Sequence, residues 1–325
     1  MNRVLLDPAE VAEAVNLDGA RAAHIHGVLK LAPGGVLKIG VVNGFAGTAE
    51  VLESTPETAR LRILTRDETP PAPWCDLILA LPRPRAMKRL WPELACLGVR
   101  DIHIVNAAKV EKSYFASRVT DPETYTPLLL DGLMQSGATA LPRVHIHPRF
   151  NVFISDVLPA LLAPATPVEG RLKIAPPLPL LAHPGPATPF HFEMNGVGAV
   201  TKFFSLDLFP LFSPDSHLYS EYSPLSSFVM RHVSSFTPLL AVGPDGGGTP
   251  GELAAFFDAG FHPFSLGERP LRTDSACVAL LATLHYLFAV ERAQAQRAQA
   301  RPNAVGDEQS NVVEFQSLSL APPPP

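Results

Sequence analysis

The chain of 325 residues has few cysteines, few charged residues and no long apolar run. Its three cysteines are widely spaced, and none belongs to a CxxC pair. A disulfide framework and a cysteine-based zinc site are therefore excluded, and we expect reduced thiols and no bound metal. No stretch comes near the roughly 18 consecutive apolar residues of a membrane-spanning helix. The first residues also form too short an apolar run for a signal peptide, so we expect a cytoplasmic protein that does not enter a membrane.

Charge is scarce and unevenly distributed. The formal net charge is −5, which is not typical of a nucleic-acid-binding protein. The segment from residue 83 to residue 118 differs, because it holds eight basic and three acidic residues. Such a patch can supply phosphate contacts even on an acidic protein, although a solvated helix face has the same composition. The candidate residues for such phosphate contacts with a nucleic acid are Arg83, Arg85, Lys88, Arg89 and Lys112.

The proline-rich stretch 69–73 marks a predicted domain boundary. Before it, short β-like runs alternate with glycine turns, including the hairpin signal Asn43-Gly44, which predicts a small β-barrel or sandwich over residues 1–70. After it, strands and helices alternate, which predicts an α/β domain over residues 71–300 with a mainly parallel sheet. The expected strands are 75–81, 101–105, 143–147, 171–182, 238–242 and 261–265, and the expected helices include 85–97, 124–135 and 152–162.

Two other segments interrupt or end this pattern. Residues 186–236 hold ten of the 25 aromatic residues, whereas a flexible linker would be poor in aromatics. We expect this insert to fold onto the body or a partner, as a substrate lid or as extra packing or dimer surface. Residues 301–325 are rich in proline and polar residues, and we predict a disordered tail without an assigned role.

Two turns near the C-terminus are the strongest functional signal. The first, Gly243-Pro244-Asp245-Gly246-Gly247-Gly248, follows an apolar strand, and its glycines allow positive φ and close approach of backbone amides to a ligand. Thr249-Pro250-Gly251-Glu252 forms a capping box, so a helix begins directly after the turn. The second turn, residues 266–276, follows the next strand. In open α/β sheets ligands bind at this edge, where such turns lie.

Together the turns resemble the signature of a known family. A Gly-Pro-acid-Gly-Gly turn, a helix and then Leu-Gly-x-Arg-x-Leu-Arg-x-acid-x-Ala are similar to the RsmE-type small-subunit rRNA uridine-N3 methyltransferases of the SPOUT superfamily. The stretch 24–31 resembles that family's N-terminal PUA-like domain, which helps to bind RNA. If extended, this stretch places His24 and His26 on one face of a strand, without the further ligands that a metal would need.

The resemblance implies a fold, a cofactor and partners. The fold is a SPOUT-like α/β domain with a C-terminal trefoil knot, preceded by a PUA-like β-barrel. The cofactor is S-adenosyl-L-methionine, and the partner is ribosomal RNA or the small ribosomal subunit. A homodimer is implied through residues 274–292, where five residues recur at helical spacing: Val278, Leu281, Leu284, His285 and Phe288. Packing inside the chain's own core would give the same spacing.

The resemblance also assigns residues to roles. The implied cofactor-binding residues are Ala182, His183, Pro184, Gly243, Pro244, Gly246, Gly247, Leu266, Gly267, Leu271 and Thr273. Methyl transfer to a uridine requires loss of the N3–H proton and stabilisation of the resulting anion. Arg269 and Arg272 suit this anion or an RNA phosphate, with Asp245 and Asp274 to orient them, although ordinary salt bridges would also explain them. The candidate catalytic residues are therefore Arg269, Arg272 and Asp245.

Departures from the family pattern leave alternatives open. Asp245 replaces the family's usual glutamate, and Asp274-Ser275 replaces Glu-Thr. Met134 and Ala138 stand where the family usually has an acid and an arginine. A non-catalytic RNA- or ribosome-binding protein on the same fold is therefore the second hypothesis. A nucleotide-dependent enzyme is the third, but it would need a lysine that the glycine turn lacks.

Overall fold

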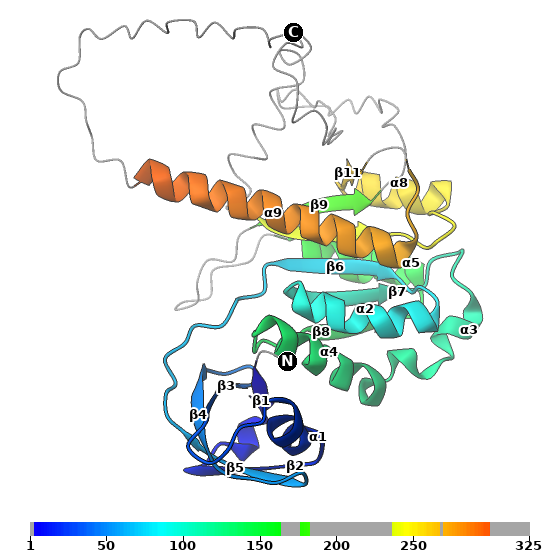
Figure 1. Cartoon of the computed structure of the whole chain (residues 1–325). Coiled ribbons are helices and arrows are strands. Elements are labelled where there is room, and N and C mark those ends of the chain that lie inside the picture. Colours follow the sequence, from blue (N-terminus) through cyan, green and yellow to red (C-terminus); the bar gives the residue numbers. More distant parts are fainter. Residues whose placement is uncertain (1–2, 164–175, 183–235, 267–268, 300–325) are drawn as a thin grey trace, which may run out of the picture.

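The computed structural model describes residues 3–163, 176–182, 236–266 and 269–299, and every structural statement below concerns these residues. Two sheets lie on either side of the stretch 64–74, with the smaller, N-terminal one below the larger one in Figure 1. The predicted tail, nearly all of the predicted aromatic insert, and three predicted site residues lie outside the described residues: His183, Pro184 and Gly267.

The N-terminal sheet has five strands in the order β1-β3-β4-β5-β2. Its first strand pairs in parallel with β3, and the other neighbours are antiparallel. One face of the sheet carries a separate apolar core, as the alternation of buried and exposed residues along β2 and β5 indicates. Its elements are β1 (Val4–Leu6), η1 (Pro8–Glu10), β2 (Ala14–Asp18), α1 (Gly19–Ala23), η2 (His24–Val28), β3 (Val36–Val41), β4 (Ala46–Ser54) and β5 (Thr58–Ile63).

Residues 24–28 are helical, so an extended strand with His24 and His26 on one face is wrong. The alanine-rich helix α1 continues directly into the π-helical turn η2, in which the Leu29 N–H donates to the His24 carbonyl at 2.9 Å. Ile25 is fully buried beneath this turn and fixes the helix to the core. The predicted Asn43-Gly44 turn is confirmed: it joins β3 to β4, with Asn43 in the left-handed region at φ 56°.

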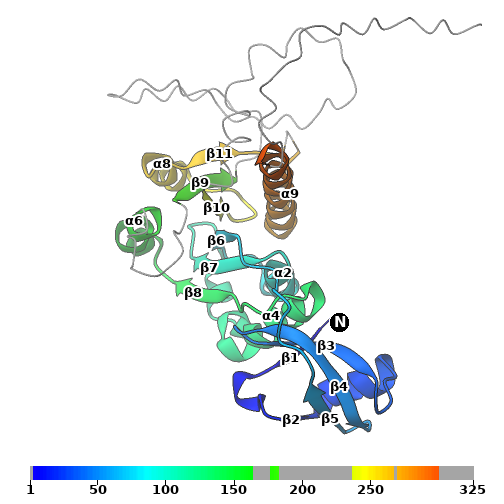
Figure 2. The ribbon, with the colours of Figure 1, turned by 90° about the vertical axis from the view of Figure 1, so that its left-hand side faces the viewer.

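The second sheet has six parallel strands in the order β11-β9-β10-β6-β7-β8, which confirms the predicted parallel α/β architecture. Figure 2 shows α6 and α8 on one side of this sheet and α2, α4 and α9 on the other. The central strands are buried on both faces and are therefore continuously apolar, as in β6. The strands are β6 (Cys75–Ala80), β7 (Val99–Val105), β8 (Arg143–His147), β9 (Pro177–Ala182), β10 (Thr237–Val242) and β11 (His262–Phe264).

The helices of this part connect the strands and cover the sheet. They are α2 (Pro84–Cys96), α3 (Lys112–Phe115), η3 (Arg118–Thr120), α4 (Pro122–Ser136), α5 (Phe150–Val152), η4 (Phe153–Val157), α6 (Leu158–Leu162), α8 (Pro250–Asp258) and α9 (Thr273–Gln299). Because all six strands are parallel, the turns that follow β6, β7, β8, β10 and β11 meet at one edge of the sheet. That edge is the carboxyl edge of the sheet, and the two glycine-containing turns lie there.

Helix α9 packs along the chain's own core. Three of the five residues expected at a dimer interface, Leu281, Leu284 and Phe288, are at most 4% exposed. Leu281 and Leu284 belong to the core, and Phe288 packs on Trp74 with ring centroids 5.5 Å apart. A fourth, His285, stacks on Trp74 with ring centroids 5.2 Å apart. The helical spacing therefore reflects intramolecular packing. By length and hydropathy alone the window Thr273–Val290 could cross a membrane, and 33% of it is buried inside the structure.

Candidate functional site

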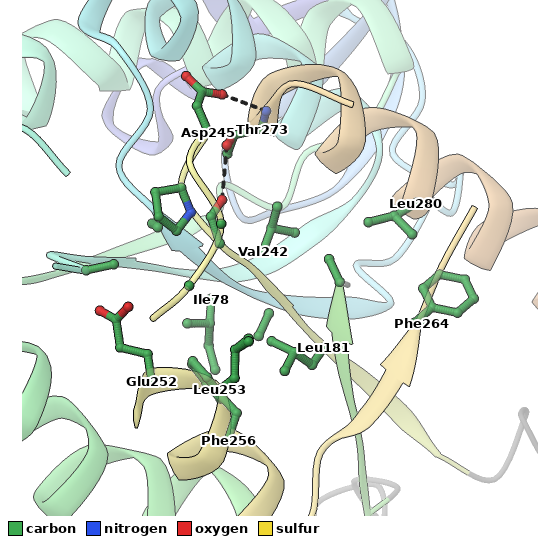
Figure 3. Close-up of a pocket in the computed structure, with 18 of the residues that line it drawn as sticks. Ile78, Leu181, Val242, Asp245, Glu252, Leu253, Phe256, Phe264, Thr273 and Leu280 are labelled. Atoms are coloured by element: carbon green, nitrogen blue, oxygen red, sulfur yellow. Dashed lines mark hydrogen bonds between the residues drawn. The ribbon is translucent and has the colours of Figure 1, made fainter. Parts of the chain in front are cut away.

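The two turns are bonded to each other through the first residue of α9. The Thr273 backbone N–H donates to Asp245 Oδ1 at 2.9 Å, and the Thr273 hydroxyl donates to the Gly243 carbonyl at 3.0 Å (Figure 3). The first turn is closed by a bond from the Gly247 N–H to the Pro244 carbonyl at 2.8 Å, with Gly247 at φ 69°. Glycine is required at this position because other residues are strained there. Segments 30 residues apart are thus held as one rim.

A cavity of about 230 Å³ lies inside this rim, at the carboxyl edge of the sheet. Its floor is apolar and comes from strands of the parallel sheet and from helices α8 and α9, as Figure 3 shows. The floor residues include Ile78, Leu181, Val242, Phe256, Phe264 and Leu280. The polar groups of the cavity come mainly from the two turns and from Glu252. An apolar slot edged by backbone polar groups suits a planar heterocycle such as a nucleobase.

The loop after β7 closes a further side of the cavity. The Ala108 N–H donates to Glu252 Oε1 at 2.6 Å, while Glu252 Oε2 accepts from the Thr249 N–H and hydroxyl at 2.8 and 3.0 Å. The Lys109 ammonium donates to the Gly246 carbonyl at 2.7 Å. The capping box was predicted and is confirmed, but its glutamate also joins this loop to α8. Nothing in the sequence indicated this contact, because its partners are 144 residues apart.

The structure brings most of the predicted cofactor-binding residues together. Of the eight that it describes, seven line the cavity: Ala182, Gly243, Pro244, Gly247, Leu266, Leu271 and Thr273. The eighth, Gly246, is exposed, and a Cβ atom there would meet the Lys109 side chain at 3.1 Å instead of entering the cavity. The predicted set did not include Ala107 or Phe150, which also line the cavity.

The three predicted catalytic residues lie in different settings. Arg269 is exposed and lines the mouth of the cavity. Arg272 is exposed outside the lining, with its Nε 3.9 Å from Asp274 Oδ1. Asp245 was expected to orient an arginine, but among the described residues its Oδ1 accepts the Thr273 N–H instead. It therefore acts as a clamp between the two turns in the described part of the chain.

The predicted RNA-binding residues are all exposed. Arg89 of α2 pairs with Asp274 of α9 at 3.4 Å, which places the basic face of α2 beside the second turn. Asp274 thus lies between the guanidinium groups of Arg89 and Arg272. A set of cations from two distant segments therefore borders the same rim, an arrangement that suits a polyanion.

The two departures at the end of α4 lie away from the cavity. The Met134 carbonyl accepts a bond from the Arg3 N–H at 3.2 Å, on the side of the N-terminal sheet. Ala138 is buried, 7% exposed, and is not a lining residue. The missing acid and arginine therefore remove no group from the described cavity.

Cys277 of α9 is buried and is not among the residues that line the cavity. Burial, followed by the nearby Asp274 carboxylate, raises the pKa of Cys277 to about 12, so the thiol stays protonated at neutral pH. Among the residues that the structure describes, no group of three His, Cys, Asp or Glu side chains could hold a metal ion. The arrangement is that of a parallel α/β protein with a ligand cavity between two bonded turns and a basic border.

A family model for the RNA methyltransferase domain matches residues 68–168 and 220–285, and the chain belongs to this family. It is similar to the ribosomal RNA small subunit methyltransferase E of Treponema pallidum, with 26% identity over 294 residues that cover 88% of this chain and 92% of the relative.

Two solved structures share the fold. One is the structure of a ribosomal RNA small subunit methyltransferase E from Neisseria gonorrhoeae bound to S-adenosyl methionine. Its TM-score is 0.55 and its identity is 20%, and the alignment covers 89% of this chain and 98% of that chain. The other is the structure of a methyltransferase from Legionella pneumophila, also in complex with this cofactor. Its TM-score is 0.57 and its identity is 19%, and the alignment covers 88% of this chain and 97% of that chain.

Proposed function

We propose that this chain is an S-adenosylmethionine-dependent methyltransferase that methylates N3 of a uridine in small-subunit ribosomal RNA. The observation that carries the proposal is the apolar cavity at the carboxyl edge of the sheet, enclosed by two turns that Thr273 joins. The names of the relative from Treponema pallidum and of the structure from Neisseria gonorrhoeae support the reaction and the substrate. Uridine N3 as the acceptor follows from the resemblance of the two turns to the RsmE-type family.

The residues present suit the cofactor. The floor residues would surround the adenine, and backbone groups of the two turns would bond its edge and the ribose. When bound, the cofactor supplies an electrophilic methyl group on a sulfonium. The chain itself contributes position: the Thr273 bonds hold the two turns at a fixed separation, and Glu252 holds the loop after β7 against α8.

The basic border serves the RNA. Arg269 at the mouth and Arg272 beside it would contact a phosphate or the anion that forms when uridine N3 loses its proton. Asp274 limits the freedom of the Arg272 and Arg89 side chains, since it lies within ion-pair distance of both. The exposed cations of α2 would extend this surface along the RNA backbone.

Several finer features belong to the same proposal. We expect the strands and turns after residue 236 to form a trefoil knot, and the five-stranded N-terminal sheet to be a PUA-like RNA-binding barrel. We also expect a cytoplasmic homodimer that acts on the small ribosomal subunit. A dimer through α9 would use its outward face, where Tyr286 is 64% exposed, because Leu281 and Leu284 are taken by the core.

Calorimetric titration with S-adenosylmethionine tests the cofactor. We expect binding in the micromolar range and its loss in Gly243→Val, because Gly243 lines the cavity. A Cβ at this position meets only the Gly248 nitrogen, at 3.6 Å, so the substitution leaves the turn in place. Gly27→Val is the matched control, since a Cβ there meets nothing within 4 Å and lies beside the other sheet. Equal affinity in both variants would contradict this cavity as the site.

Mass spectrometry of small-subunit RNA then tests the reaction. Incubation of unmodified small subunits with the protein and S-adenosylmethionine should produce 3-methyluridine. A protein that binds the cofactor and the subunits but produces no methylated uridine would overturn the proposed reaction. Binding to the subunits without cofactor binding would instead identify a non-catalytic RNA-binding protein on the same fold.

A further inference from the structure

A second hollow lies directly beside the cofactor cavity. It has a volume of about 520 Å³ and opens at the carboxyl edge of the sheet, between the loop after β7, helix α5 and the first turn of α8. Phe150 and Glu252 line both the hollow and the cavity, so these two side chains form the partition between them. Along the loop after β7, Ala107 lines the cavity while its neighbours Asn106 and Ala108 line the hollow. A group in the hollow is therefore adjacent to a group in the cavity.

The polar lining of the hollow differs from that of the cavity. Two residues with side-chain amides line it, Asn106 and Asn151, together with the apolar Phe150 and Ile154. The Asn106 amide donates one N–H to the Pro148 carbonyl at 3.0 Å, which leaves its second N–H available. Asn151 is exposed on α5. Amide N–H groups donate to carbonyl oxygens, and an aromatic ring offers a face or edge to a planar base.

Hydrogen bonds to neighbouring residues hold the Glu252 side chain of the partition in place. Both oxygens of the Glu252 carboxylate already accept bonds, from the Ala108 N–H and from Thr249. Glu252 is therefore a positioning residue. Among the side chains that line the hollow, those of Asn106 and Asn151 carry N–H donors. The Arg149 side chain, which precedes α5, is exposed.

We infer that this hollow holds the target pyrimidine of the RNA, with the Asn106 and Asn151 amides donating to its two ring carbonyl oxygens. The inference rests on the proposed function and names the substrate subsite of that reaction. In uracil the two carbonyls flank N3 on one edge of the ring, so donors to both carbonyls also fix N3. Asn106 is next to Ala107 and Asn151 is next to Phe150, which line the cavity, so this edge lies beside the cavity. Loss of the N3–H proton places negative charge on both carbonyl oxygens, and the same N–H groups stabilise that anion. Cytosine offers one carbonyl and an amino group, and so satisfies only one of the two donors.

Photo-crosslinking tests the location without any turnover. A uridine octamer with one central 4-thiouridine is irradiated with the full chain in the presence of S-adenosylhomocysteine, and the tryptic peptides are mapped. We expect crosslinks on the peptides that begin at Asp101 and at Phe150, competed by oligouridine and about 10-fold less by oligocytidine. Crosslinks confined to α2 or to the N-terminal sheet, or competed equally by both oligomers, would overturn the inference.

Kinetics with variants of Asn151 test the chemistry. We expect Asn151→Ala to lower kcat by about 10-fold and Asn151→Asp by about 100-fold, because the carboxylate has no N–H to donate and repels the forming anion. The pH at which kcat reaches half its maximum should rise in Asn151→Ala, a shift that a purely structural role would not cause. Ser155→Ala, one turn further along the same helical segment and outside the hollow, is the matched control.

Binding of S-adenosylmethionine separates the possible failures. Its affinity should stay within about twofold in both Asn151 variants. A large loss of cofactor affinity would show that the hollow holds part of the cofactor and would overturn the inference while leaving the proposed function intact. If the wild-type chain makes no 3-methyluridine, the crosslink map still decides whether a pyrimidine enters the hollow.

Discussion

At the scale of single residues, Thr273 illustrates how one side chain fixes a site made from two turns. It is 3% exposed, and its hydroxyl satisfies the Gly243 carbonyl while its backbone N–H satisfies Asp245. Removal of the hydroxyl leaves a carbonyl unpaired at the rim of the cavity. A typical buried bond of this kind contributes about 1 kcal/mol.

Thr273→Val should therefore weaken S-adenosylmethionine binding by about 5-fold, since the shape is kept and one bond between the turns is lost. Calorimetry would measure the affinity. Thr283→Val, at a half-buried threonine further along the same helix and outside the cavity lining, should bind as the wild type does. The interpretation fails if the two variants bind the cofactor equally well.

A second residue-scale feature is the histidine cluster on β7 and β8. Burial, followed by the neighbouring His145 and His147, lowers the pKa of His103 to about 4. His103 Nδ1 lies 3.1 Å from His147 Nε2, its ring stacks on that of His145, and its Nε2 is buried without a partner among the described residues. His145 in turn contacts the Asp101 carboxylate at 3.0 Å.

The unfolded chain binds a proton at His103 near its ordinary pKa, whereas the folded chain does so only near pH 4. The free energy of unfolding should therefore rise with pH between about 4 and 6.5, and His103 should account for about 2 kcal/mol of the rise from pH 4.5 to pH 7. Urea unfolding at the two pH values measures it. His103→Phe keeps an aromatic ring and should reduce the difference. An unchanged difference in His103→Phe would contradict the assignment.

At the scale of elements, α2 and α4 pack closely because of one glycine. A Cβ atom on Gly132 would lie 2.1 Å from the Pro92 carbonyl oxygen and 3.0 Å from the Ala95 Cβ. Alanine favours a helix over glycine by about 1 kcal/mol, but here it would force the two backbones apart. The steric term outweighs the propensity term, since interiors do not yield to such overlap.

Gly132→Ala should lower the free energy of unfolding by about 3 kcal/mol, as measured by urea denaturation. Gly27→Ala, in the helical turn η2 where a Cβ meets nothing within 4 Å, should leave stability equal or slightly higher. A Gly132→Ala variant as stable as the wild type would show that α2 and α4 can separate without loss.

The elements that the sequence predicted best are those with strong local signals. The apolar strands of the parallel sheet and the capped helix α8 follow from runs and caps within a few residues. Strand β4 was not expected, because its alanines and Gly47 are weak strand formers and its place is set by pairing with β3 and β5. The helical spacing of apolar residues in α9 did not distinguish a dimer interface from the chain's own core, because both kinds of helix face have the same periodicity.

Prediction of the site was likewise limited to what local sequence patterns indicate. The two turns were found from their residues, and seven predicted lining residues meet at one cavity. The contacts of Glu252 with Ala108 and of Arg89 with Asp274 were not predictable, because each joins segments more than 140 residues apart. Asp245 was expected to orient an arginine, but the backbone of Thr273 takes its carboxylate. Side-chain partners depend on register between distant elements, which no local pattern contains.

At the scale of the whole molecule, a few bonds join the two sheets. The Asn43 N–H donates to the Thr139 carbonyl at 2.7 Å, and the Asn43 side-chain Oδ1 accepts from the Leu141 N–H at 2.8 Å. The Thr139 hydroxyl donates to the Gly44 carbonyl at 2.9 Å. The hairpin turn between β3 and β4 is thus docked on the segment that precedes β8. If both sheets contact one RNA, this docking sets the distance between the two contact surfaces.

Replacement of Asn43 by glycine removes the side chain whose Oδ1 accepts the Leu141 N–H, and glycine keeps the left-handed backbone at φ 56° without strain. The Leu141 amide should then exchange its hydrogen faster, and the affinity for small-subunit RNA should fall about 3- to 10-fold because ordering the two sheets adds to the cost of binding. Cofactor affinity should not change, since the cavity draws no lining from the N-terminal sheet. Hydrogen exchange and filter binding give the two readings.

Asn43→Ala separates docking from backbone strain. It loses the same bond and also places an L-residue in the left-handed region, at an added cost of about 1 kcal/mol, so it should be less stable than Asn43→Gly. The RNA affinities of the two variants should nevertheless match, because both lack the oxygen that holds Leu141. Faster exchange at Leu141 with unchanged RNA affinity would show that the N-terminal sheet binds no RNA in concert with the cavity. Such a result would restrict substrate recognition to the parallel sheet and its basic border.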